Sequence, residues 1–143
     1  MSFDLKIKNG DLVLDSSGSL VSVSGNNKIR QDIVKILLTK PGDNRFHPIY
    51  GSNLGYLKIG EVSDESIVEL ELKRSAEDSI RYLISLQRSQ SRNQVLSLSE
   101  IILDITNISV DRDLADPRLY NIYISILTQK LDIIDEIITI RII

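Results

Sequence analysis

Isoleucine is concentrated in the last third of this 143-residue chain. Of its last 43 residues, 14 are isoleucine, a β-branched side chain that suits a pleated surface. Strands are predicted over 97–111, 119–129 and 132–142, and isoleucines share one face in the second and third of them. Polar turns separate the three segments. Because consecutive strands with short links pair antiparallel, we expect a three-stranded antiparallel sheet.

The first 25 residues also predict β structure. Phe3, Leu5 and Ile7 alternate with charged residues and are followed by Asn9-Gly10. This dipeptide is a strong hairpin signal because both residues tolerate a positive φ. With a second turn at 15–18, the segment 3–24 is expected to form a small hairpin or meander.

Two helices are predicted between these β regions. Ile29, Ile33 and Ile36 recur at helical spacing after Gly25, and an asparagine at 26 or 27 is the expected N-cap. The second helix, over 63–88, has apolar residues four apart along one stripe. The fold class is therefore α+β. We expect one domain over 1–143, made of an N-terminal β-hairpin (1–25), a helical core (26–93) and a C-terminal β region (94–143).

Composition excludes several classes of function. The chain has 17 basic and 20 acidic residues and a net charge of −3, whereas nucleic-acid binders are usually basic. It has no cysteine, so disulfides and thiolate metal sites are excluded. No signal peptide is visible, and no apolar run approaches the roughly 20 residues that span a bilayer. We expect a soluble protein, made inside the cell, that binds neither nucleic acid nor membrane.

Residues 39–54, here called the elbow, combine two of the three prolines with the only histidine. Pro41 ends the first helix because it lacks an N–H and restricts the residue before it. Aromatic and proline residues then alternate with basic ones. The elbow is predicted to be a rigid joint whose side chains contact other proteins. The candidates for this contact are Arg45, Phe46, His47 and Tyr50.

No catalytic chemistry is predicted. His47 has no neighbouring carboxylate other than Asp43, and no second histidine exists for a metal site. The carboxylates Glu61, Glu65 and Glu69 lie near or on the second helix, where acidic residues are expected for capping and solubility. The glycines form no phosphate-binding loop. We therefore expect no catalytic, cofactor-binding or metal-binding residue, and a protein that is not an enzyme.

The last strand points to assembly instead. Residues 135–143 are rich in isoleucine, contain few charges and lack proline. Such a strand is either the buried centre of the sheet or an unprotected edge that pairs with another chain. The sequence leaves both possibilities open. The residues of this strand that are candidates for partner contact are Ile138, Ile140 and Ile142.

The order of motifs from the first helix through the elbow resembles the baseplate wedge and sheath-initiator family of contractile phage tails. In that pattern a helix carries a glutamine and ends in Leu-Leu-Thr. A Pro-Gly or Lys-Gly turn, a Phe-Gly or Tyr-Gly pair and a leucine follow. The matching residues here are Gln31, Leu37-Leu38-Thr39, Pro41-Gly42, Tyr50-Gly51 and Leu54. The N-terminal Asp4-Leu5 and Gly10-Asp11-Leu12 are similar to longer members of the family.

The resemblance implies a structural virion protein of the tail baseplate, made in the host cytoplasm and present in multiple copies in a symmetric assembly. It implies that the chain joins the wedge to the sheath and initiates sheath assembly through its C-terminal β region. The implied partners are the sheath protein and other wedge proteins, with tube or hub proteins as further candidates. Similar proteins occur in type VI secretion and other contractile injection systems.

Two points qualify the resemblance. Many family members carry Glu-Pro-Arg near the end of the long helix, whereas residues 86–92 here contain no Glu-Pro. Arg88 and Arg92 are the candidates for this wedge contact. Some relatives are labelled lysozyme-like, so the alternative function is a small cell-wall glycan hydrolase.

Overall fold

The computed structural model describes residues 2–54 and 64–142. Its two long helices are α1 (Gly25–Leu38) and α2 (Glu65–Gln90), and a short 3-10 turn, η3 (Leu98–Glu100), precedes the sheet. The sheet strands are β5 (Ile102–Arg112), β6 (Leu119–Thr128) and β7 (Ile133–Arg141). Four short strands precede the helices: β1 (Asp4–Leu5), β2 (Ile7–Lys8), β3 (Asp11–Leu12) and β4 (Ser22–Val23). The predicted α+β arrangement is confirmed.

The three long strands form one antiparallel sheet in the order β5-β6-β7. β6 is central, and β7 lies at an edge. Of the two possibilities that the sequence left open for the last strand, the edge is the one observed. Isoleucines on one face of β6 and β7 are buried against the helices, and each contributes about 1.5–3 kcal/mol of burial free energy. They are Ile122, Ile124, Ile126, Ile134, Ile138 and Ile140.

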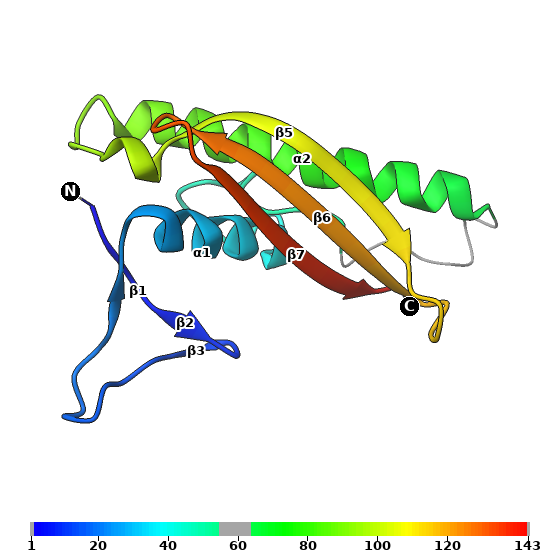
Figure 1. Ribbon diagram of the computed structural model, residues 1–143, viewed down its shortest axis with the longest axis horizontal. Helices are drawn as coiled ribbons and strands as arrows, with labels where there is room; N and C mark the ends of the chain where they lie inside the picture. Colours follow the sequence, from blue (N-terminus) through cyan, green and yellow to red (C-terminus); the bar gives the residue numbers. More distant parts are fainter. Residues whose placement is uncertain (1, 55–63, 143) are drawn as a thin grey trace.

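Both helices cover the same face of the sheet (Figure 1). α2 runs along β5, and α1 lies against η3 and β7. The buried residues of α1 recur at the spacing that the sequence predicted, with Ile29, Ile33 and Ile36 inaccessible to solvent. On α2, Leu72 and Ile80 are likewise inaccessible to solvent. One continuous core therefore fills the space between the helices and the sheet.

Residues 4–23, here called the N-terminal ribbon, extend away from this body in Figure 1. The strands pair as β1 with β4 and β2 with β3. Asn9 and Gly10 have φ values of 53° and 81°, as the hairpin signal predicted. Gln31 of α1 holds the ribbon, because its side chain accepts from the Ile7 N–H and donates to the Leu5 carbonyl, both at 2.8 Å.

Two local predictions are wrong. The N-cap of α1 is Ser24 rather than an asparagine, since Asn26 and Asn27 already lie in the first turn. The segment 97–101 is not strand, because Ser97 and Glu100 form a capping box around η3 and so satisfy N–H groups that a strand would leave to its neighbour. Ser63, the predicted start of the second helix, lies outside the described residues.

The N-cap of α2 is Asp64, whose carboxylate accepts from the Ser66 N–H at 2.9 Å. In the part of the chain that the structure describes, no helix is both long enough and apolar enough to cross a membrane.

Candidate functional site

The second half of the elbow is a joint between the helices. Gly51 has φ +131°, and a Cβ at this position would lie 2.5 Å from the Thr39 carbonyl oxygen, so only glycine fits. Next to it, the Ser52 N–H donates to that same oxygen at 2.9 Å. The Ser52 hydroxyl donates to the Leu37 carbonyl. These contacts fasten the elbow to the C-terminal end of α1.

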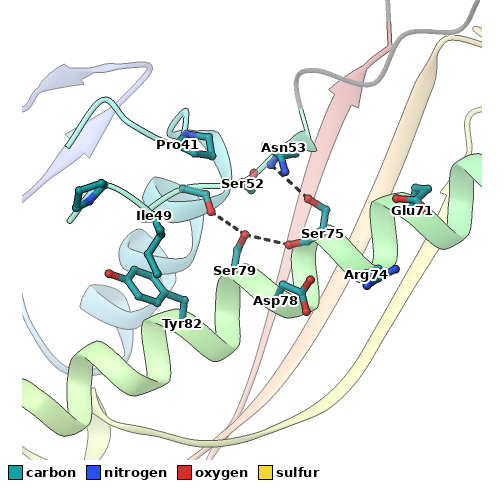
Figure 2. Close-up of a pocket in the computed structure, with 12 residues that line it drawn as sticks. Pro41, Ile49, Ser52, Asn53, Glu71, Arg74, Ser75, Asp78, Ser79 and Tyr82 are labelled. Atoms are coloured by element: carbon teal, nitrogen blue, oxygen red, sulfur yellow. Dashed lines mark hydrogen bonds between the residues drawn. The ribbon is translucent and has the colours of Figure 1, made fainter. Parts of the chain in front are cut away.

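The same segment is fastened to the middle of α2 (Figure 2). The Ser79 hydroxyl lies 2.8 Å from the Gly51 carbonyl oxygen and 2.9 Å from that of Ser75, and shares its hydrogen between them. The Asn53 N–H donates to the Ser75 hydroxyl at 3.3 Å. A groove of about 780 Å³ remains between the elbow and α2. The predicted joint is therefore built from small polar side chains and main-chain groups.

The first half of the elbow is the part that faces solvent. Arg45, Phe46 and His47 are exposed, and Phe46 retains 89% of its accessible surface. The Asn44 side chain accepts from the N–H groups of Phe46 and His47, which fixes a local turn. Of the four contact residues predicted on the elbow, these three are exposed.

Tyr50 differs from the other elbow candidates, because it is partly buried and packs against the core. Burial raises the pKa of its hydroxyl to about 12, and the negative charges of Asp32 and Asp4 act in the same direction. Its ring therefore supports the joint, and only part of it is accessible.

A charged cluster ties the N-terminal ribbon to α1 nearby. Burial raises the pKa of Asp32, although the Lys28 ammonium lies 2.7 Å from its carboxylate and opposes the shift. Burial also acts on Asp4, but the hydrogen bond and charge of Lys35, at 2.7 Å, hold the pKa of Asp4 below its ordinary value. Each acid is matched by a lysine, so the cluster serves attachment of the ribbon.

The candidate acids and the histidine lie apart in the part of the chain that the structure describes. No hydrogen bond or ion pair joins the His47 side chain to a carboxylate among residues 2–54 and 64–142, and no group of three potential metal ligands occurs there. Glu65 pairs with Arg112 at 3.1 Å on the surface. Glu61 lies outside the described residues.

The two arginines proposed for wedge contact lie where the sequence placed them. Arg88 is in the last turn of α2, and Arg92 follows the helix. Both are exposed. Next to Arg88 on α2, Gln87 is buried and was missed as a structural residue. Its side chain donates to the Glu100 carbonyl and accepts from the Ile102 N–H, both at 2.9 Å.

In β7, the residues whose side chains are buried are not the residues whose backbone groups line the free edge. Ile138, Ile140 and Ile142, the predicted contact residues, are buried against the helices, so their side chains belong to the core. On the outer face, Ile137 is 58% exposed.

The hydrogen bonds at the two ends of β7 show which of its backbone groups bond to β6. The Thr128 N–H donates to the Asp132 carbonyl, and the Ile142 N–H donates to the Arg118 carbonyl, both at 2.9 Å. Since backbone groups alternate in direction along an antiparallel strand, even-numbered residues bond to β6 and odd-numbered residues face outward. Within the described residues, the outward groups of Ile137, Thr139 and Arg141 have no backbone partner.

The opposite edge of the sheet is less regular. The pairing of β5 with β6 shifts register between Ile102 and Asp104 and again between Ile105 and Asn107, whereas β7 pairs with β6 without a shift. Bulges twist an edge and discourage further pairing. β7 is therefore the edge that suits strand addition.

These features define the protein as an α+β domain with two helices under a three-stranded antiparallel sheet and one regular free edge. This fold is similar to a crystal structure from Geobacter sulfurreducens described as a "putative tail lysozyme". The TM-score is 0.61 at 13% sequence identity, over 93% of this chain and 97% of the other. No protein-family model matches the sequence, and a search of curated proteins found no significant match.

Proposed function

We propose that this chain is a structural component of a contractile-tail baseplate and that the tail sheath begins to assemble on it. The observation that carries the proposal is the regular free edge of β7, where the outward backbone groups of Ile137, Thr139 and Arg141 have no backbone partner among residues 2–54 and 64–142. The similar fold of a protein named for a tail and the motif order of the elbow support the same assignment.

The proposed mechanism is strand addition. A segment of the first sheath ring pairs with the free edge of β7, about 4.8 Å away, and extends the sheet by one strand. The buried isoleucines of β7 give this edge a rigid support, because they fix the strand against α1 and α2. The template is therefore preorganised, and little ordering of β7 opposes the pairing.

The remaining exposed candidates are proposed to contact other baseplate proteins. Arg45, Phe46 and His47 lie on the elbow, Arg88 lies in the last turn of α2, and Arg92 follows that helix. Wedge proteins are the proposed partners, with several copies of the chain in a symmetric particle. The particle is proposed to be a phage tail, with a bacterial contractile injection system as the alternative.

A proline at position 137 tests the mechanism. Ile137→Pro removes an outward N–H and places a ring at the free edge, but it breaks no hydrogen bond to β6. We expect assembly of co-expressed tail sheath protein to fall about tenfold or more, as counted by electron microscopy. Ile137→Thr is the matched control, because it changes the side chain and keeps the N–H. Normal sheath assembly on the proline variant would overturn the proposal.

Truncation of residues 136–143 is less informative, because it also removes buried core side chains from the sheet. Ile138, Ile140 and Ile142 together fill the space above α1 and α2. The substitution at Ile137 leaves all three in place.

We propose further that the chain is not a glycan hydrolase. Hydrolysis of this kind needs one desolvated acid beside a second, polar carboxylate. Glu65 is exposed and paired with Arg112, and Glu69 lies one turn further along the same helix. Purified protein should release no soluble fragments from peptidoglycan. Release that is lost in Glu65→Gln or Glu69→Gln would contradict this.

A further inference from the structure

Arg30 contacts the edge of β7 next to the segment that is proposed to pair with the sheath. This residue lies on α1, and its Nη1 atom donates to the Asp135 carbonyl oxygen of β7. The same atom lies 3.6 Å from the Glu136 carboxylate. A helix side chain therefore reaches across to the sheet edge.

The carbonyl that Arg30 binds is one of the outward-facing groups. Asp135 is odd-numbered, so its N–H and C=O point away from β6. Its carboxylate is also engaged, because the Ser125 hydroxyl on β6 donates to it. The guanidinium thus fills the position that an N–H of an added strand would need. A charged side chain at an edge is a known protection against pairing.

We propose that Arg30 sets the boundary of strand addition. Pairing with the sheath segment covers Ile137, Thr139 and Arg141 and stops at Asp135. The inference rests on the proposed function, and it adds a residue that fixes the register and length of the interface. Removing the guanidinium would extend the pairing to Asp135 and Ile133.

Amide hydrogen exchange, measured residue by residue on rings assembled with the tail sheath protein, tests the boundary. In the natural chain, assembly should slow exchange at Ile137, Thr139 and Arg141 by about tenfold or more. Exchange at Asp135 and Ile133 should stay as fast as in the free protein. In Arg30→Ala, assembly should slow exchange at these two residues as well.

Arg81→Ala is the matched control, since Arg81 is an exposed helix arginine that pairs within α2. In Arg81→Ala, as in the natural chain, assembly should leave exchange at Asp135 and Ile133 fast. In free Arg30→Ala, slow exchange at Ile134 and Glu136 reports an intact pairing of β7 with β6.

The outcomes separate the two proposals. Slowed exchange at Asp135 in the natural chain would overturn the role of Arg30 and leave strand addition standing. Fast exchange at Asp135 in assembled Arg30→Ala would overturn it as well. If no odd-numbered amide of β7 slows on assembly, strand addition itself fails, and the boundary fails with it.

Discussion

The elbow and the free edge of β7 differ in how their backbone polar groups are satisfied. Around Gly51 and Ser52, the carbonyls of Leu37, Thr39 and Gly51 all accept hydrogen bonds from the chain itself. Along β7, outward groups from Ile137 onward have no partner within the described residues. Buried polar groups are almost always paired, and the second half of the elbow follows this rule within the chain itself. The exposed edge of β7 instead offers backbone groups with which a further strand could pair.

The largest effect on the elbow is expected from Gly51→Ala. The added Cβ would meet the Thr39 carbonyl oxygen at 2.5 Å, at a φ of +131°. We expect the free energy of unfolding to fall by about 3 kcal/mol, measured by chemical denaturation. Gly42→Ala, at φ +95° with no atom within 4 Å, is the control and should cost about 1–2 kcal/mol. Equal effects would mean that the close approach at Gly51 is unimportant.

A smaller effect is expected from Tyr50 at alkaline pH. The folded protein holds the Tyr50 proton up to about pH 12, whereas the unfolded chain releases it near pH 10. Ionisation therefore favours the unfolded state as the pH rises from 10 to 12, and stability falls. Because Tyr50 is only partly buried, we expect this fall to be about 1–2 kcal/mol.

Denaturation of the natural chain and of Tyr50→Phe at about pH 8 and about pH 11 measures this contribution. The phenylalanine variant should lose less stability between the two pH values. If both proteins lose the same free energy of unfolding, the Tyr50 hydroxyl is not buried in the folded elbow.

The smallest effect is expected at Phe46. Because this side chain is 89% exposed, Phe46→Ser should change the free energy of unfolding by less than about 0.5 kcal/mol. Leu54→Ala, at the buried end of the same elbow, should cost about 2–5 kcal/mol. A large loss in Phe46→Ser would show that the exposed half of the elbow also supports the fold.

Periodicity predicted the helices and the sheet because their apolar residues all face one core. Ile29, Ile33 and Ile36 are four or three residues apart and are all buried. The glycine turn at Asn9-Gly10 was likewise predictable, because turn chemistry is local.

The features that sequence reasoning missed depend on distant contacts. Nothing in the local sequence marks Gln87 as structural, because its hydrogen-bond partners Glu100 and Ile102 lie 13 and 15 residues away. Arg30 has no sequence signal that links it to β7, and only the fold brings it to Asp135, 105 residues further along the chain. The position of β7 at an edge also required the strand order, since an isoleucine-rich strand fits the centre of a sheet equally well.

Strand addition at β7 is tested most directly by a cryo-electron microscopy reconstruction of the assembled particle, at a resolution that separates strands about 4.8 Å apart. The account predicts a strand of the sheath protein hydrogen-bonded beside Ile137–Arg141. A free β7 edge, with the sheath contacting β5 or the outer surface of α2 instead, would contradict it.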